Sequence, residues 1–353
     1  MPVNNSIMKI SPFTLKKFRD GIYVVILSIF LGGLFAFIMS VAVAGSFNLQ
    51  KDFRYILLGT LTGFGVSSGI LLLNEIFLKR KARPLWFSLL VTPFLQTALI
   101  SFVYAFVFIS LLGYDSFWKD SYLFHTVSFS LILTVLTSLY ADIERLLGRH
   151  VLKGLLFGTY RRPKNEKRFV MFLDLAGSTA VAERLGSLKF HAFLNDFFCD
   201  IARPIINHGG EICKYVGDEA IITWPEKTAG LPYGPLLVFF AIDEIIKKRH
   251  NYYTSRYGLI PQFRAGLHFG SIVAGEMGLT RQEIAYSGDV MNTAARIQSE
   301  CRLRNEIFLV SDETLSRLGE KADFPQSINI VSHGTVSLRG KSSDLAISAV
   351  RSA

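Results

Sequence analysis

The sequence contains little cysteine, and its cysteines lack the spacing of a metal site or a disulfide framework. The three thiols are Cys199, Cys213 and Cys301, all in the second half of the chain. They exclude a small disulfide-stabilised secreted domain and predict reduced side chains in a cytoplasmic domain. A cleavable signal peptide is also missing, because the first apolar segment is too long and has no clear small-residue cleavage site.

Acidic residues are scarce relative to basic ones. The chain has 28 Asp and Glu against 38 Lys and Arg, which gives a net charge of +10. Such an excess is compatible with nucleic-acid binding. Many of the basic residues, however, flank apolar segments, where membrane topology alone places them, and some suit anionic lipid headgroups. We therefore expect no nucleic-acid partner.

Apolar residues are abundant instead, at 50% of 353 residues, and they are concentrated before about residue 140. Four apolar segments approach or exceed the ~20 residues that cross a bilayer. They cover roughly 22–44, 55–78, 85–113 and 122–140. This pattern predicts an α-helical four-span transmembrane domain over residues 1–140. No lysine lies within these segments, which disfavours light sensing through a retinal Schiff base.

Smaller features of the four segments refine this prediction. The first two contain closely spaced glycines, which predict tight helix packing: Gly32, Gly33, Gly59, Gly63, Gly65 and Gly69. Pro93 predicts a kink in the third. Gln96 and His125 are the candidates for polar function within the membrane, and a helix–helix hydrogen bond or an interfacial position is the favoured interpretation. Basic residues before the first segment, between the second and third, and after the fourth place both ends inside. We expect a multi-pass protein of the inner or plasma membrane with its soluble half in the cytoplasm.

A linker of residues 141–165 separates the two halves. Ile143, Leu147 and Val151 recur every four residues between charged positions, which predicts an amphipathic helix. Two interpretations stay open: a short coiled-coil stalk that pairs two chains, or a juxtamembrane helix that rests on lipid. A polar hinge follows at 161–167.

Two aspartates end strand-like apolar runs in the second half. Asp174 closes the run Arg168–Asp174, and Asp218 lies in a tight turn between Glu211–Val216 and Glu219–Trp224. Each has an ordinary explanation alone, as a helix cap or a turn residue. Carboxylates at strand ends beside Gly and Ser/Thr also suit a divalent metal held against phosphate, and the pair predicts such a site.

Strand and helix patterns alternate from Arg168 to the end of the chain. Strands are expected near 168–174, 211–216, 219–224, 261–268, 271–275, 283–287, 306–310, 328–338 and 345–351. Helices are expected near 178–208, with a break at Gly186, and near 232–250, 289–301 and 311–318. This order predicts an α+β sheet with helices on one face.

Five segments occur in this half in a fixed order: Phe172–Thr179, Lys214–Asp218, Arg264–Gly270, Gly288–Arg296 and Leu338–Lys341. Together they resemble the class III nucleotidyl cyclase catalytic domain, and the resemblance covers nearly all of residues 166–351. Each segment is weakly specific alone, but all five in order are strongly specific. The resemblance implies a ferredoxin-like catalytic domain over residues 166–353, a head-to-tail homodimer, and active sites built from both chains.

The family joins the ribose 3′-hydroxyl of a nucleoside triphosphate to its α-phosphate and expels pyrophosphate with two divalent ions, Mg²⁺ or Mn²⁺. By resemblance, Asp174 and Asp218 bind these metals with help from the backbone of Leu175. Backbone N–H groups at the start of the next helix are expected to bind phosphate. The residues concerned are Gly177, Ser178 and Thr179, of which Ser178 is expected to cap the helix.

Further polar residues follow from the same resemblance. Asn292 and Arg296 lie four apart and so share one face of a helix. The family uses these positions to orient the ribose and to stabilise charge on the transition-state phosphate, which needs a fixed amide and a permanent cation. Arg339 and Lys341 match the closing basic motif, where one of the two is expected to bind the triphosphate.

The base-reading positions point to adenine with one departure. Lys214 matches a family lysine that accompanies adenine, which favours ATP over GTP. The second position is Ala285, which has no polar group, whereas adenine-specific relatives carry Asp or Thr there. Tyr286, Ser287 or the backbone is expected to substitute, and fewer buried hydrogen bonds predict looser specificity.

These observations lead to one main hypothesis and two alternatives. The main one is a membrane-bound adenylate cyclase that acts as a homodimer, takes ATP, and responds to an unidentified signal through its membrane domain. The alternatives are a guanylate or relaxed-specificity cyclase, and a catalytically silent cyclase-like module that binds nucleotide. Loss of Asp218, Asn292 or Arg296 would favour the silent module, and all three are present.

Overall fold

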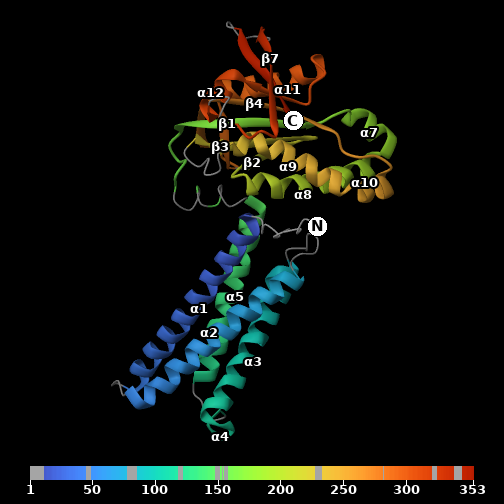
Figure 1. Cartoon of the computed structure of the whole chain (residues 1–353). Helices are drawn as coiled ribbons and strands as arrows, with labels where there is room; N and C mark the ends of the chain where they lie inside the picture. Colours follow the sequence, from blue (N-terminus) through green and yellow to red (C-terminus); the bar gives the residue numbers. More distant parts are fainter. Residues whose placement is uncertain are drawn as a thin grey trace, which may run out of the picture. The chain divides into compact units, whose positions relative to one another are not determined.

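The chain divides into two compact units, Met1–Leu152 and Lys153–Ala353. The computed structural model describes residues 12–44, 49–77, 86–117, 122–147, 152, 154, 158–226, 233–280, 282–319, 324–337 and 344–353. The first unit consists of helices, and the second is a sheet with helices packed against it (Figure 1).

Helices occupy all four segments predicted to be apolar spans. Their bounds are α1 (Pro12–Ala44), α2 (Leu49–Phe77), α3 (Thr92–Leu112) and α5 (Tyr122–Leu147), with the short α4 (Tyr114–Phe117) between the last two. The distortion predicted at Pro93 is a π-helical turn, η1 (Phe87–Val91), which leads directly into α3. Part of the predicted linker, residues 148–151, 153 and 155–157, lies outside the described residues.

Two of these helices pass the test of length and composition for crossing a membrane. The qualifying windows are Gly21–Ile38, in α1, and Leu89–Leu112, which includes α3. Within the described residues, the prediction of four spans is therefore supported for two helices.

Small residues bring α1 and α2 into close contact, as the sequence predicts. A Cβ atom built on Gly32 would overlap the carbonyl oxygen of Gly59, and one built on Gly63 would overlap that of Ser28. Only glycine permits backbones to approach this closely.

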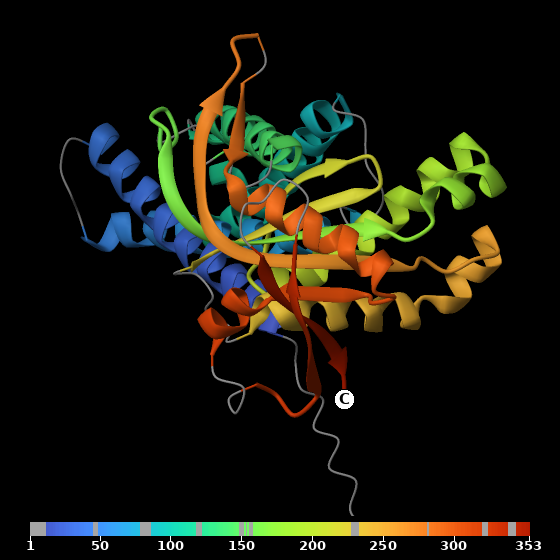
Figure 2. The same cartoon turned by 90° about the horizontal axis from the view of Figure 1, so that it is seen from above.

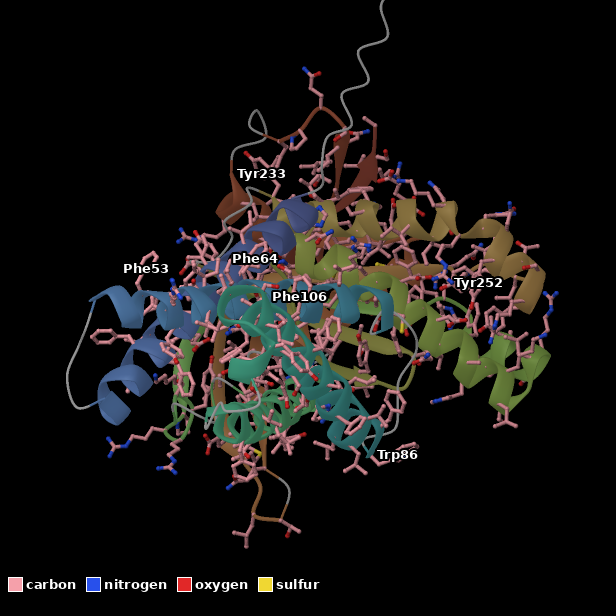
Figure 3. The ribbon with its side chains drawn as sticks, turned by 90° about the horizontal axis from the view of Figure 1, so that it is seen from below. Phe53, Phe64, Trp86, Phe106, Tyr233 and Tyr252 are labelled. Atoms are coloured by element: carbon pink, nitrogen blue, oxygen red, sulfur yellow. The ribbon has the colours of Figure 1, made fainter. Side chains whose placement is uncertain are left out.

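The first unit exposes apolar side chains and buries polar ones. Phe53, Phe64, Trp86 and Phe106 are between 51% and 66% exposed on its helices (Figure 3). Its buried polar residues include Ser67, Gln96, Thr97, Ser130, Thr134 and Ser138. The helical unit thus has a small apolar core around Leu58 and Phe108 but also carries a large apolar outer surface.

The second unit contains one mixed eight-stranded sheet in the order β2-β3-β1-β4-β6-β8-β7, with β5 paired to β4. The strands are β1 (Lys164–Leu175), β2 (Glu211–Val216), β3 (Glu219–Pro225), β4 (Phe263–Met277), β5 (Glu283–Ser287), β6 (Phe308–Ser311), β7 (Ile328–Val336) and β8 (Leu345–Ser352). Only the β4–β6 pairing is parallel among the described strands. The core β2-β3-β1-β4, with helices after β1 and β3, has the predicted βαββαβ order.

β4 is one continuous strand, so the prediction of two strands, 261–268 and 271–275, is wrong. Its pairing with β1 runs through the predicted break, with Arg168 opposite Gly270. Figure 2 shows the strong curvature of this strand. Gly270 lacks a side chain and so resembles a turn residue in the sequence, whereas its backbone stays paired in the sheet.

Helices cover both faces of the sheet, which corrects the prediction of one face. On β1, Met171 and Leu173 pack with α8 (Ser187–Asn207) and α9 (Gly234–Lys248). The alternate residues Val170 and Phe172 pack with Val290 and Ala294 of α11 (Asp289–Leu303). Figure 1 shows α8 and α9 on one side of the sheet and α11 on the other. Because Phe169–Leu173 of β1 is an unbroken apolar run, its pattern does not distinguish a strand covered on one face from one covered on both.

The remaining helices are α7 (Ser178–Leu185), α10 (His250–Tyr257) and α12 (Asp312–Leu318). The predicted break between α7 and α8 is confirmed at Gly186, whose φ of 73° suits glycine.

Candidate active site

The ends of β1 and of the β2–β3 hairpin bring Asp174 and Asp218 together. Asp174 is the last but one residue of β1, and it pairs across the sheet with Glu219, the first residue of β3. Asp218 precedes Glu219 in the two-residue turn, where Gly217 adopts a φ of 62°. The tight turn thus holds the second carboxylate beside the end of the first strand.

The electrostatics of this corner reflect crowded acidic groups. Burial raises the pKa of Asp174 to about 6, with the charge and a hydrogen bond of Asp218 as the next causes. Burial, followed by the charges of Asp174 and Asp218, raises the pKa of Glu219 to about 7. The amide Nε2 of Gln298, on α11, donates to Oδ2 of Asp174 at 3.2 Å and opposes this rise.

Glu219 and Gln298 are not among the site residues predicted from the sequence. Glu219 directly follows Asp218, so its position in the sequence indicates that it lies near the acidic pair. Gln298 lies 124 residues from Asp174 and gave no local signal.

The oxygen donors of this corner fit a divalent cation. Asp174 and Asp218 supply carboxylates, which are the ligands that Mg²⁺ prefers, and like charges held together are relieved by a cation. Within the described part of the chain no group of three or more His, Cys, Asp or Glu forms a ready metal cage. The acidic pair therefore matches a site whose remaining ligands are water, substrate phosphate and backbone, such as the neighbouring Leu175.

The segment after β1 turns sharply into α7. Gly177 is the residue that caps α7, with a φ of 70° and no side-chain hydrogen bond to the helix. The prediction that Ser178 is the cap is therefore wrong, because Ser178 is already the first helical residue and Gly177 alone tolerates this backbone conformation. The helix start, including exposed Thr179, lacks a side-chain cap, which leaves backbone N–H groups open to an anion.

Asn292 and Arg296 lie on the face of α11 that points away from the sheet. Asn292 is exposed and Arg296 is half-buried, whereas Ala294 and Ile297 on the opposite side are buried. Gln298, which contacts Asp174, lies on the side of α11 nearer the sheet. One chain therefore does not bring Asn292 and Arg296 to its own Asp174.

The predicted base-reading residues lie on two neighbouring elements. Lys214 is exposed on β2, and its Nζ lies 3.4 Å from Oε1 of Glu283, the first residue of β5. Ala285 follows on the same strand, half-buried and paired with Gly275. Arg339 and Lys341 lie outside the described residues, so their predicted phosphate contact has no structural description.

A buried arginine supports the strands that carry these residues. Arg168, 1% exposed, donates to Glu166 at 2.9 Å, to Glu211 at 2.7 Å and to Thr223 at 3.0 Å. Its guanidinium lies 5.3 Å from the ring centre of Tyr286 on β5. This network joins β1, β2, β3 and β5.

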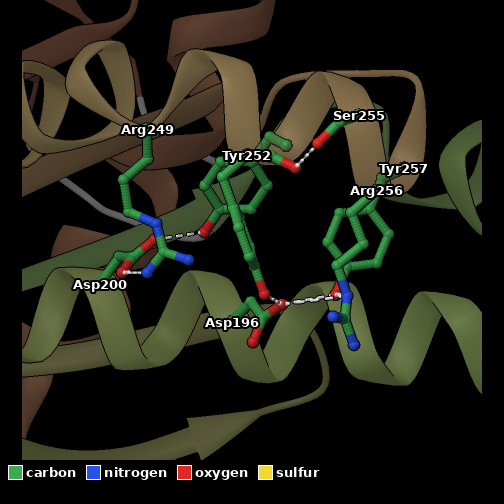
Figure 4. Close-up of polar contacts among 8 residues, drawn as sticks. Asp196, Asp200, Arg249, Tyr252, Ser255, Arg256 and Tyr257 are labelled. Carbon is green, nitrogen blue, oxygen red and sulfur yellow. Dashed lines mark hydrogen bonds and ion pairs between the residues drawn. The ribbon is translucent and has the colours of Figure 1, made fainter.

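A second polar cluster holds α10 against α8 (Figure 4). The hydroxyls of Tyr252 and Tyr257 donate to Oδ2 of Asp196 at 2.7 and 2.6 Å. Arg249 at 2.5 Å and Tyr253 at 2.6 Å donate to Asp200 in the same way. Burial opposes ionisation of Asp196, but the two tyrosine hydroxyls outweigh it and lower the pKa. These pairs are structural, since all of them join two helices on one face of the sheet.

Known proteins with similar sequences include nucleotide cyclases, in agreement with the site described above. The profile of the adenylate and guanylate cyclase catalytic domain matches residues 161–347. Adenylate cyclase 2 of Rhizobium meliloti (strain 1021) is 43% identical over 176 residues, which are 50% of this chain and 48% of that protein. An adenylate cyclase of Anabaena cylindrica is 26% identical over 186 residues, covering 52% of this chain and 36% of that protein.

The fold itself recurs in a solved structure. A bacterial light-regulated adenylyl cyclase superimposes with a TM-score of 0.53 at 17% identity, over 66% of each chain. The curated relatives are matched over about half of their length or less. The profile nevertheless spans more than half of this chain and includes both aspartates and α11. The chain therefore belongs to the family that carries the adenylate and guanylate cyclase catalytic domain.

Proposed function

We propose that this protein is a membrane-bound adenylate cyclase that converts ATP to 3′,5′-cyclic AMP and pyrophosphate at a homodimer interface. The observation that carries the proposal is the convergence of Asp174 and Asp218 from two separate strand ends, beside an uncapped helix start. The identity of 43% with a Rhizobium adenylate cyclase over 50% of the chain supports it.

In this mechanism the acidic corner would hold two divalent cations, through Asp174, Asp218 and the backbone of Leu175. Such ions, when bound, lower the pKa of the ribose hydroxyl and neutralise the β- and γ-phosphates. The backbone of Gly177, Ser178 and Thr179 binds phosphate at the start of α7. Gln298 orients Asp174 by its hydrogen bond, so that the carboxylate faces the phosphates.

The outward-facing residues of α11 supply the rest of the site from a second copy. Asn292 orients the ribose, and Arg296 stabilises the charge that develops on the α-phosphate. Because both side chains point away from their own sheet, a single chain is incomplete and the active species is a homodimer. Each of its two sites then takes the acidic corner from one chain and the α11 face from the other.

We further propose that residues 1–140 anchor the protein in a bilayer as four helices, with the N-terminus and catalytic domain in the cytoplasm. Two helices have the length and composition for this, and the exposed apolar side chains of the unit suit lipid. Residues 141–165 then link the anchor to the catalytic domain of residues 166–353, and carry an unidentified signal from the membrane.

The test is an assay of the purified full chain with ATP and with GTP, each with Mg²⁺ and with Mn²⁺. We expect cyclic AMP from ATP, and a loss of about 10³-fold in Asp174→Ala and Asp218→Ala, because several kcal/mol of charge stabilisation disappear. Asp243→Ala is the matched control, since Asp243 forms a surface pair with Lys247 on α9. Full activity of Asp174→Ala in an intact dimer would falsify the proposal.

A relaxed-specificity or guanylate cyclase is the second candidate. Ala285, which offers no polar side chain to the base, is the observation that favours it. Cyclic GMP formed from GTP at a rate equal to or above that of cyclic AMP would select this candidate. A silent nucleotide-binding module would bind ATP without turnover under every metal condition.

A further inference from the structure

We propose that Glu283 is the second side chain that reads the purine base, in the role that Ala285 leaves open. The proposal rests on the cyclase function proposed above, and it names how that site recognises its substrate. Glu283 lies outside the motifs that identify the family, so no sequence pattern assigns it a function.

The alternation of side chains on β5 decides which residues can act beside Ala285. Glu283, Ala285 and Ser287 share one face of the strand. Tyr286 and Ile284 point to the other face, where Ile284 is buried and Tyr286 packs under the guanidinium of Arg168. Tyr286 is therefore unable to replace the missing polar group, although it is the immediate neighbour of Ala285.

Glu283 is distinguished from Ser287 by its contact with the base-reading lysine. Its Oε1 lies 3.4 Å from Nζ of Lys214, and the two side chains are 49% and 58% exposed. The pair bridges β2 and β5, two strands that are not neighbours in the sheet. A donor and an acceptor thus stand side by side, both accessible to a ligand.

This pair complements the edge of adenine. Adenine presents a ring nitrogen that accepts a hydrogen bond next to an amino group that donates one. A lysine ammonium can only donate and an ionised carboxylate can only accept, so Lys214 meets the ring nitrogen and Glu283 meets the amino group. Guanine also places an acceptor beside a donor, so the pair rejects a base without the amino group more strongly than it rejects guanine.

The discriminating substrate is purine riboside triphosphate, which is ATP without the amino group. The full chain, Glu283→Ala, Glu283→Gln and the control Asp243→Ala are compared by kcat/KM for both nucleotides. We expect Glu283→Ala to reduce the preference for ATP over the analogue by about 10- to 100-fold, which corresponds to one hydrogen bond with a charged partner. The preference falls because kcat/KM for ATP falls. The analogue has no amino group for Glu283 to bind, so its kcat/KM in Glu283→Ala stays near that of the unaltered chain.

Two further variants sharpen the result. Glu283→Gln keeps an acceptor oxygen and should retain most of the preference, and Asp243→Ala should leave it unchanged. An equal loss of turnover for both nucleotides in Glu283→Ala overturns the proposal, because the carboxylate would then only position Lys214. An unchanged preference overturns it as well and leaves the cyclase function standing, whereas a chain that forms no cyclic nucleotide overturns both.

Discussion

The two units of this chain place polar and apolar side chains in opposite ways. In the helical unit, Phe102 and Phe106 are 69% and 66% exposed, while Thr97 and Thr134 are buried and bonded to each other. In the sheet unit, apolar residues such as Phe197 fill the core. Buried charged residues of the sheet unit, such as Arg168 and Glu306, are paired with residues of opposite charge.

This contrast indicates that the units are adapted to different surroundings. In water, apolar burial drives folding, and an inward charge is tolerated only when it is paired. In lipid, that driving force between helices is missing, and small residues and interhelical hydrogen bonds take its place. The arrangement of the helical unit therefore supports its proposed place in a bilayer.

Substitution of the buried, paired Arg168 should cause the largest loss of stability in the sheet unit. Arg168→Met leaves Glu166 and Glu211 facing each other without a cation, and we expect a loss of about 3 kcal/mol in the free energy of unfolding. Chemical denaturation of the full chain measures it. Lys247→Met, which removes an exposed surface pair, is the control and should cost less than about 1 kcal/mol. Equal losses in the two variants would contradict the account.

Both units use glycine for close approach, but only one such contact is expected to affect catalysis. A Cβ on Gly266 of β4 would overlap the backbone nitrogen of Gln298 and lie 2.6 Å from the carbonyl oxygen of Ala294. We expect Gly266→Ala to destabilise the sheet unit by about 1–3 kcal/mol and to reduce cyclase activity, because α11 must move.

Gly59→Ala makes the corresponding overlap between α1 and α2 and should lower thermal stability without changing the nucleotide preference. Gly65→Ala meets the side chain of Val103 rather than backbone and is the milder control. If Gly266→Ala were as harmless as Gly65→Ala, the close approach of α11 would not be needed.

The sheet unit should also lose stability in acid through Glu306. Hydrogen bonds from Arg351 lower the pKa of this carboxyl, burial opposes them, and His333 adds to the lowering. A lowered folded-state pKa contributes stability above the unfolded value of ~4.3, and this is lost as pH falls through the folded value. Glu306→Gln should cost about 1 kcal/mol at pH 7 and flatten the profile below pH ~4.5. A profile identical to that of the unaltered chain in urea denaturation would refute this role.

The smallest effect is expected inside the helical unit. Thr97 Oγ1 and Thr134 Oγ1 lie 3.2 Å apart between α3 and α5, and Thr134 donates to the carbonyl of Leu131. Thr134→Val keeps the shape and should cost about 0.6 kcal/mol. A double-mutant cycle with Thr97→Val in detergent isolates the pair. A coupling energy near zero would show that these hydroxyls do not hold the helices together.

Local patterns in the sequence were sufficient for much of the fold. Apolar stretches located α1, α2, α3 and α5, and strand-like runs located β1, β2 and β3. Gly186 marked the break between α7 and α8 because a positive φ favours glycine. Spacing also identified Asp174 and Asp218 as a pair, since strand ends and a tight turn are visible in the order of residues.

Contacts between distant residues were not visible in the same way. The continuity of β4 through Gly270 depends on its pairing with β1, and the position of α11 depends on which face of β1 it covers. Gln298 reaches Asp174 and Glu283 reaches Lys214 only after the sheet has formed.

The sequence by itself determined the two kinds of unit, the membrane-like helices and the acidic pair, because these depend on the character and spacing of neighbouring residues. The tertiary structure alone decided which side chains surround the acidic pair and the base-reading lysine, and which face of α11 points outward. The physical reason is that a residue's type fixes its chemistry, whereas its partners are fixed by strand pairing and helix packing across long separations in the chain.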